Sequence, residues 1–222
     1  FAGSISALGT ATVNALDREI SSLRVPVSVR VVSSTSGLSA IREAGCAVVI
    51  LTRQPEPQLQ SWLNALQPDK LPKARVILQP DLVKEAANEI CDNCGTPLTQ
   101  ERSSLVDDIA DMASYFSDLM NVRYLRLRLD VVTTNACRRF HIDAVTARLV
   151  CTYRGQTTKL GEAETACDPD EVVSVPQICP VVLRGSNWPG DEPTKLRHRS
   201  PPIEGSGETR LLLVLDPIYD LE

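Results

Sequence analysis

Hydrophobic residues in the first half of the chain form short apolar runs separated by stretches with helical spacing. The run at residues 46–51 lies between Gly45 and Pro55 and predicts a buried strand, and residues 74–78 predict a second one. Apolar residues recur every three or four positions in three segments, which predict helices: residues 57–66, 81–90 with Asp81 as N-cap, and 102–120. Residues 1–45 show only weak periodicity, and their structure is not assigned.

After Met120 the spacing changes from a helical period to alternation. In residues 123–131 every second side chain is apolar, which is typical of a half-buried strand. Further strands are predicted at residues 144–153, 171–175, 181–184, 195–197 and 209–215, with Gly and Pro turn clusters between them. The sequence therefore predicts an α+β fold, in which an α/β region at residues 1–120 supports a β-sandwich or jelly-roll core at residues 121–220, packed as one compact unit.

The composition narrows the range of functions. The 222 residues include 23 Lys and Arg against 28 Asp and Glu, a net charge of −5, and the scattered basic residues argue against nucleic acid or an anionic membrane as partner. No stretch reaches the roughly 18 consecutive apolar residues of a membrane span. Seven cysteines, an odd number at irregular spacing, suit a reducing compartment, so we expect a cytoplasmic protein.

Both histidines of the chain lie in the β-rich half. His141 and Asp143 form a His-x-Asp pair just before the strand predicted at 144–153, and His198 follows the strand predicted at 195–197. If the extended backbone already begins at His141, the two side chains share one inward face, because side chains alternate along a strand. Three apolar residues then have the same parity: Val145, Ala147 and Leu149.

Two imidazoles and one carboxylate can occupy one face of an iron(II) octahedron and leave positions open for a 2-keto acid and O2. We therefore predict His141, Asp143 and His198 as Fe(II) ligands. A non-catalytic metal-handling or sensing protein that holds Zn(II) with the same residues is the alternative, since most nitrogen and oxygen sites prefer zinc to iron(II). A third possibility is a structural barrel without metal, with these residues as hydrogen-bonded framework.

Arg210 lies 210 − 198 = 12 positions after His198, at the start of an apolar strand, where an unpaired guanidinium needs an anionic partner. The order His-x-Asp, distal His and then a basic residue resembles the iron(II)/2-oxoglutarate-dependent oxygenase superfamily. The resemblance implies a double-stranded β-helix (jelly-roll, cupin-like) core, 2-oxoglutarate as cosubstrate, and Arg210 as the residue that binds its distal carboxylate. The substrate, a small molecule or a protein, is not indicated.

Residues 137–155 and 198–216 also resemble a bacterial family of uncharacterised proteins that are often encoded near zinc-responsive metal-handling genes. This resemblance covers mainly residues 120–216 and implies no activity.

Other polar residues of the β-rich half are secondary candidates. Tyr124 and Tyr153 are predicted to hydrogen-bond the cosubstrate from neighbouring strands, although buried tyrosines more often bond to the backbone. Arg148, like Arg126 and Arg128, is a further basic candidate for binding a keto-acid or substrate carboxylate. However, the position of Arg148 along its strand has the opposite parity to that of His141, which predicts a solvated outer face for its side chain.

Cys91 and Cys94 form a Cys-x-x-Cys pair. Such a pair can supply half of a zinc site, act as a redox dithiol, or be an incidental pair in a loop. No second pair at suitable spacing exists, which favours the last of these interpretations.

Overall fold

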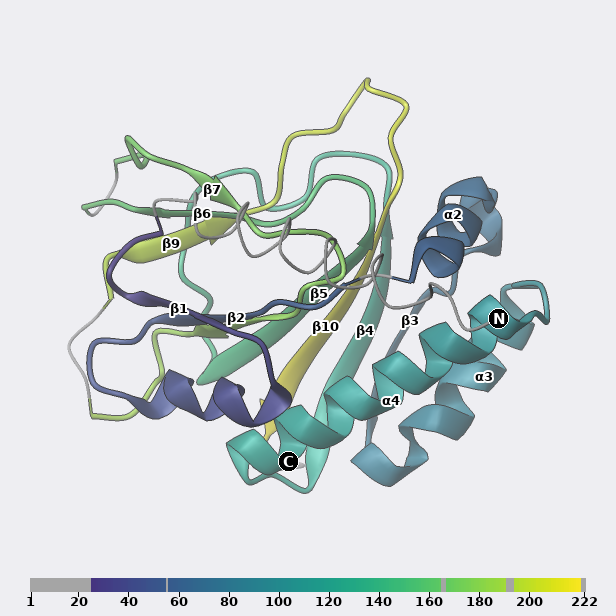
Figure 1. Cartoon of the computed structure of the whole chain (residues 1–222), viewed down its shortest axis with the longest axis horizontal. Helices are drawn as coiled ribbons and strands as arrows, with labels where there is room; N and C mark the ends of the chain where they lie inside the picture. Colours follow the sequence, from purple (N-terminus) through teal and green to yellow (C-terminus); the bar gives the residue numbers. More distant parts are fainter. Residues whose placement is uncertain (1–24, 55, 165–166, 191–193, 221–222) are drawn as a thin grey trace, which may run out of the picture.

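The computed structural model describes residues 25–54, 56–164, 167–190 and 194–220, and in this part of the chain the strands form two sheets (Figure 1). Across the large sheet the order is β1 (Val29–Val32), β2 (Val48–Leu51), β8 (Val181–Arg184), β5 (Ala147–Arg154), β10 (Arg210–Ile218), β4 (Tyr124–Val132) and β3 (Ala74–Leu78). The small sheet has the order β7 (Val173–Ser174), β6 (Lys159–Glu162) and β9 (Leu196–Arg199). β1 and β2 run parallel, and the other neighbouring strands are antiparallel.

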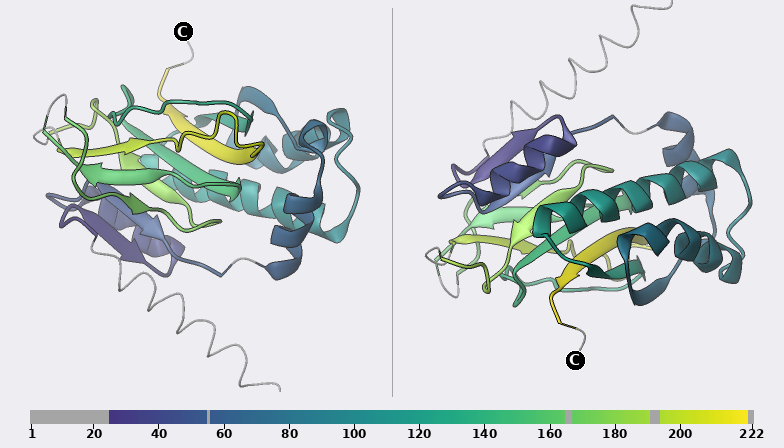
Figure 2. Two further views of the ribbon diagram at one scale, coloured as in Figure 1. Left: turned by 90° about the horizontal axis from the view of Figure 1, so that it is seen from above. Right: turned by 90° about the horizontal axis from the view of Figure 1, so that it is seen from below.

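The helices cover the face of the large sheet that lies away from the small sheet (Figures 1 and 2). They are η1 (Thr35–Arg42), α2 (Pro57–Ala65), η2 (Pro68–Lys70), η3 (Pro80–Leu82), α3 (Val83–Asn93) and α4 (Gln100–Met120). None of the helices in the described ranges is long and apolar enough to cross a membrane.

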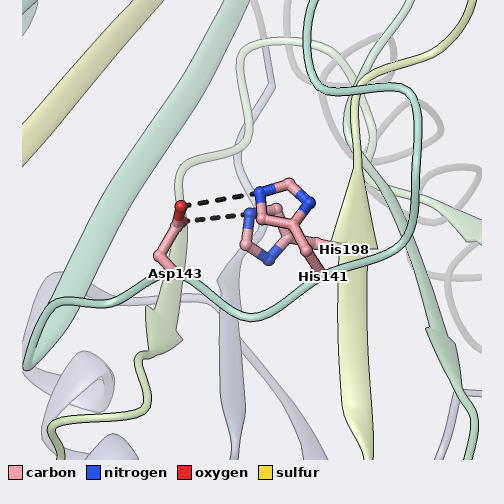
Figure 3. Close-up of side chains that lie close together, drawn as sticks. All are labelled: His141, Asp143 and His198. Atoms are coloured by element: carbon pink, nitrogen blue, oxygen red, sulfur yellow. Dashed lines mark ion pairs between the residues drawn. The ribbon is translucent and has the colours of Figure 1, made fainter. Parts of the chain in front are cut away.

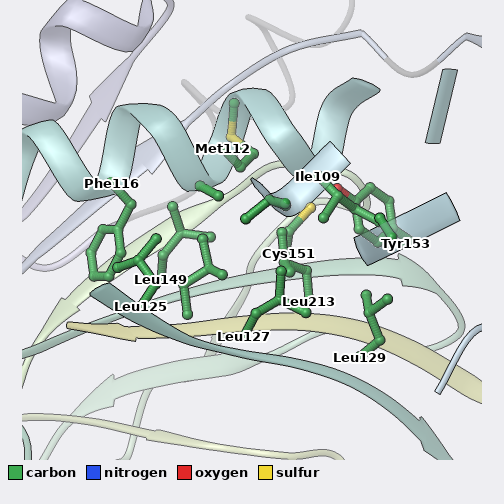
Figure 4. Close-up of a cluster of buried hydrophobic side chains, with 14 of the residues drawn as sticks. Ile109, Met112, Phe116, Leu125, Leu127, Leu129, Leu149, Cys151, Tyr153 and Leu213 are labelled. Carbon is green, nitrogen blue, oxygen red and sulfur yellow. The ribbon is translucent and has the colours of Figure 1, made fainter. Parts of the chain in front are cut away.

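The longest helix, α4, is specified at both ends and along one face. The Thr99 side chain accepts a hydrogen bond from the Arg102 backbone N–H, and Asn121 ends the helix in the left-handed conformation with φ of 52°. Its apolar stripe packs on the large sheet, as Figure 4 shows for Ile109, Met112, Phe116, Leu125, Leu127, Leu149 and Leu213.

A second hydrophobic core lies between the two sheets. Large-sheet residues such as Val150, Leu212 and Val214 pack there with Leu160 and Leu196 of the small sheet. Strands β5 and β10 therefore bury both faces, one against the helices and one against the small sheet. This double burial explains why residues 211–215 of β10 are continuously apolar.

The predicted elements agree with the structure in type, and the boundaries differ mainly at strand ends. Residues 74–78 and 181–184 are reproduced as β3 and β8, whereas β10 continues to Ile218. The helix predicted at 81–90 begins at Val83, after a 3-10 turn, so Asp81 is not its N-cap. Residues 1–24 lie outside the described ranges, and the unassigned stretch from residue 25 contains β1 and η1.

The regions before and after residue 120 share the large sheet, since β1, β2 and β3 pair in it with strands from the second half. The fold is thus a mixed α/β structure with two facing sheets and helices on one side.

Candidate metal centre

His141, Asp143 and His198 meet between the two sheets (Figure 3). His198 Nε2 lies 3.1 Å from Asp143 Oδ2, and His141 Nε2 lies 3.5 Å from Asp143 Oδ1. One ligand atom from each residue lies within 4.8 Å of the other two, and the imidazole centroids are 4.4 Å apart. Three donors at this spacing can bind a single metal ion from one side.

The two histidines are fixed to each other through their backbones. His141 N–H donates to His198 O and His198 N–H donates to His141 O, both at 3.0 Å, which forms a β-bridge at the edge of the small sheet. The His141 Nδ1–H donates to the carbonyl of Arg139 at 2.9 Å, which orients the ring so that Nε2 faces Asp143.

The backbone around Asp143 is held against the end of β8. Ser186 N–H donates to Asp143 O at 2.9 Å, and Asn187 N–H donates to Val145 O at 3.1 Å. A Cβ at Gly185 would lie 1.9 Å from Val145 O and 2.7 Å from Asp143 O, so only glycine permits this contact.

The predicted common face of residues 141–149 is wrong. Strand β5 begins only at Ala147, and the chain bends at residues 144–146, which reverses the parity of the strand relative to Asp143. Ala147 and Leu149 therefore pack in the core beneath the helices, whereas Val150 faces the small sheet.

The predicted solvated position of Arg148 is wrong for the same reason. Its side chain is 18% exposed, and Nη1 lies 2.6 Å from Asp143 Oδ1. The same guanidinium contacts the carboxylate of Asp216, Nε to Oδ1 at 2.6 Å and Nη2 to Oδ2 at 3.0 Å.

These contacts keep Asp143 ionised. Burial alone would raise the pKa of Asp143, but the two imidazoles and the Arg148 guanidinium together hold it well below its usual range. The hydrogen-bonded partner Asp143 raises the pKa of His141, whereas burial lowers the pKa of His198 and favours its neutral form. A carboxylate beside a neutral imidazole is a suitable pair of donors for a divalent cation.

Arg210 lines the same pocket as the three residues, and this pocket has a volume of about 140 Å³. The Arg210 side chain is completely buried, and burial lowers its pKa to about 10. Nε donates to Gln156 O at 2.6 Å, but Nη1 and Nη2 have no hydrogen-bond partner among the described residues. The remaining lining includes Arg128, Asp130, Val132, Cys137, Val150, Thr158, Ser200, Leu212 and Val214.

Tyr124 and Tyr153 are not among the residues that line this pocket. The Tyr124 hydroxyl lies 3.2 Å from Gln79 Nε2, from which it accepts a hydrogen bond. Tyr153 is buried on the helix side of the sheet, where its hydroxyl donates to Asp108 Oδ2 at 2.5 Å (Figure 4).

Cys91 and Cys94 lie at the end of α3, apart from the three residues. Cys91 is fully buried, and burial raises the pKa of its thiol. The group of possible metal ligands found in the described ranges contains neither cysteine.

Asp216 contacts Arg148 beside this centre and was not among the residues predicted from the sequence. A carboxylate that continues the apolar run at residues 211–215 is a usable signal, because a buried charge requires a partner.

Comparisons with known proteins agree with this fold. The 2-oxoglutarate binary complex of dioxygenase for auxin oxidation 1 from Arabidopsis thaliana is similar, with a TM-score of 0.54 and 9% identity over 87% of this chain and 92% of that one. The dioxygenase for auxin oxidation of rice has a TM-score of 0.49 and 11% identity over 86% of this chain and 83% of that one. At these identities the first similarity shows a shared fold only.

No curated protein matches the sequence. A family model, described as a protein of unknown function (DUF1826), matches residues 33–216, so the chain belongs to the DUF1826 family.

Proposed function

We propose that this protein is a non-haem Fe(II)/2-oxoglutarate-dependent oxygenase with a double-stranded β-helix core. His141, Asp143 and His198 hold the iron, and Arg210 binds the distal carboxylate of 2-oxoglutarate. We further propose that the protein acts in the cytoplasm on a small molecule or a protein, without nucleic acid or membrane as partner.

The observation that carries this proposal is the unpaired guanidinium of Arg210. A buried donor without a partner costs about 1–3 kcal/mol, and more when it is charged. Both terminal nitrogens of Arg210 are in this state, in the pocket that also contains the three candidate ligands. A dicarboxylate that chelates a metal and reaches Arg210 would pair both nitrogens at once.

The candidate ligands also fit a metal ion. Asp143 Oδ2 is buried and makes no hydrogen bond among the described residues, although it lies near His198 Nε2. A buried carboxylate oxygen without a hydrogen bond is unfavourable even though Arg148 pairs with the other oxygen, and a divalent cation would satisfy Oδ2 and both imidazoles together.

The protein's own side chains would hold the metal and exclude water from the pocket. The iron with its keto acid supplies the oxidising chemistry on a substrate C–H bond when both are bound. His141 and His198 present fixed nitrogens, and Asp143 supplies one negative charge. Val150, Leu212 and Val214 line the pocket with apolar surface, which excludes water.

Zinc on the same residues is the alternative, as part of a metal-handling protein. A zinc site closed by the protein needs a fourth ligand. In the described ranges the ligand group has three members, and Cys137 lines the pocket without joining that group. Three donors support an open site, which favours the oxygenase.

Anaerobic titration of the Fe(II)-loaded protein with 2-oxoglutarate tests the proposal through the visible charge-transfer band of the chelate. We expect the band in the wild type and in Arg75→Ala, an exposed arginine on the edge strand β3, and a loss of about 10-fold or more in 2-oxoglutarate affinity in Arg210→Ala. No band in the wild type, or equal affinity in the two variants, would overturn it.

A further inference from the structure

The carboxylate of Asp143 is also contacted by Arg148, which forms an ion pair with Asp216. Arg148 Nη1 lies 2.6 Å from Asp143 Oδ1, and the other edge of the guanidinium, Nε and Nη2, is bound by both oxygens of Asp216. The three side chains form a line from β10, through β5, to the segment before β5.

The Asp216 end of this row of three side chains is rigid. Asp216 is 2% exposed, and β10 pairs with both β5 and β4, so its backbone is hydrogen-bonded on two sides. A bidentate contact fixes the plane of a guanidinium, because two parallel N–H groups meet two oxygens. Arg148 therefore presents Nη1 to Asp143 from a fixed position.

We infer that Arg148 is a positioning residue, which occupies Asp143 Oδ1 and so restricts Asp143 to one metal-binding oxygen, with Asp216 as the anchor of Arg148. The inference rests on the proposed function. The oxygen left over is Oδ2, which has no hydrogen-bond partner among the described residues and lies on the side of His198.

The restriction matters because a carboxylate can coordinate through one oxygen or two. Two protein nitrogens and one oxygen leave three positions of an octahedron, two for a keto acid and one for O2. A second oxygen from Asp143 would take one of these positions. Arg148 thereby preserves the number of open positions, and its charge also reduces the negative charge that Asp143 and Asp216 bring to the site.

The effect on metal affinity alone is a poor test, because two consequences of removing Arg148 oppose each other. Loss of the guanidinium frees Asp143 to rotate, which weakens binding. It also removes a positive charge near the cation, which strengthens binding. Binding of the keto acid and the energy of the charge-transfer band report the open positions directly.

The experiment compares Arg148→Gln, Arg148→Lys and Asp216→Asn with the wild type, each loaded with Fe(II) anaerobically and titrated with 2-oxoglutarate. We expect a displaced charge-transfer band and about 10-fold weaker 2-oxoglutarate binding in Arg148→Gln. Asp216→Asn should change in the same direction, and Arg148→Lys, which can still reach Asp143, should restore part of the affinity. Arg126→Gln, whose residue lies opposite Asp216 in the β4–β10 register, is the matched control and should leave the wild-type band.

The outcomes separate the two proposals. A wild type without any band overturns the proposed function. A wild-type band that is unchanged in position and affinity in Arg148→Gln overturns the role of Arg148 while the proposed function stands. Should Arg148→Gln fail to fold, as judged by circular dichroism, Arg148→Lys and the isosteric Asp216→Asn decide, and wild-type spectra in both would overturn the inference.

Discussion

His141 and His198 are joined by two reciprocal backbone hydrogen bonds, each 3.0 Å long. The bridge sets the positions of both imidazoles before any ion arrives, because it fixes the backbones from which they project. Much of the ordering cost of assembling the two nitrogen donors is thus already met by the folding of the small sheet.

A preformed site predicts stabilisation by metal. Fe(II) under anaerobic conditions at 100 times its Kd should stabilise the protein by about 2.7 kcal/mol, since the ion binds the folded state. For a chain of this size we expect a rise of roughly 5–10 °C in Tm, measured by differential scanning calorimetry. His141→Ala should abolish the rise, whereas Asp130→Asn, which removes another carboxylate of the pocket, should retain it. An equal rise in wild type and His141→Ala would contradict the assignment of the ligands.

Gly185→Ala is expected to disrupt the centre without touching a ligand. The added Cβ would meet Val145 O at 1.9 Å, so the segment that carries Asp143 must move away from β8. We expect a loss of about 2–4 kcal/mol in the free energy of unfolding, measured by urea denaturation, together with weaker Fe(II) binding.

Gly45→Ala is the control for this substitution. Gly45 has a positive φ of 73°, unlike Gly185, but nothing lies within 4 Å of the position that its Cβ would take. The cost should be about 1 kcal/mol, with unchanged metal binding. Wild-type metal affinity in Gly185→Ala would show that the contact with β8 does not position Asp143.

Tyr153→Phe tests the role that the sequence suggested for this tyrosine. The hydroxyl donates to Asp108, which also pairs with Arg53, so the variant should lose about 1–2 kcal/mol of stability. Its affinity for 2-oxoglutarate should equal that of the wild type, because Tyr153 packs on the helix side of the sheet. A weakened charge-transfer titration with unchanged stability would reverse this interpretation.

The cysteines should differ sharply in reactivity. Burial raises the pKa of Cys151 to about 12, so its thiol stays protonated and shielded, whereas Cys137 and Cys167 are exposed. Iodoacetamide at about pH 8 should modify Cys137 and Cys167 first, as mapped by peptide mass spectrometry. Since Cys137 lines the pocket, Fe(II) with 2-oxoglutarate should slow its modification and leave that of Cys167 unchanged. Equal protection of both, or of neither, would contradict occupation of this pocket.

The sequence predicts well those features that depend on local spacing. The apolar period of residues 102–120 gives α4, the continuous apolar run at residues 46–51 gives β2 within two residues, and the segments 74–78 and 181–184 match β3 and β8. The candidate ligands could be found because the chain has two histidines and because Arg210 begins an apolar strand. Chemistry of this kind is visible in residue types and their order.

Features that depend on a single bend or on distant partners could not be predicted. The bend at residues 144–146 reverses the parity of β5, and no residue pattern marks it. The sequence therefore predicts Arg148 on the outer face, whereas its side chain is largely buried beside Asp143. Strand β6 is not predicted from the sequence, because it contains Gly161 and its apolar and polar residues do not alternate clearly. The partner of Tyr153 is Asp108, from a helix far away in sequence, and only the packing of α4 on the sheet brings the two together.

Strand β10 has a consequence for folding. It inserts between β5 and β4, and it supplies Arg210 near one end and Asp216 near the other. Its contacts with β4 span most of the second half of the chain, and loop closure over such separations slows folding. Because one strand carries both residues, pairing of β10 would place Arg210 and Asp216 together. A nascent chain that has not yet paired β10 would hold both histidines and Asp143, but neither the buried guanidinium of Arg210 nor a fixed Arg148.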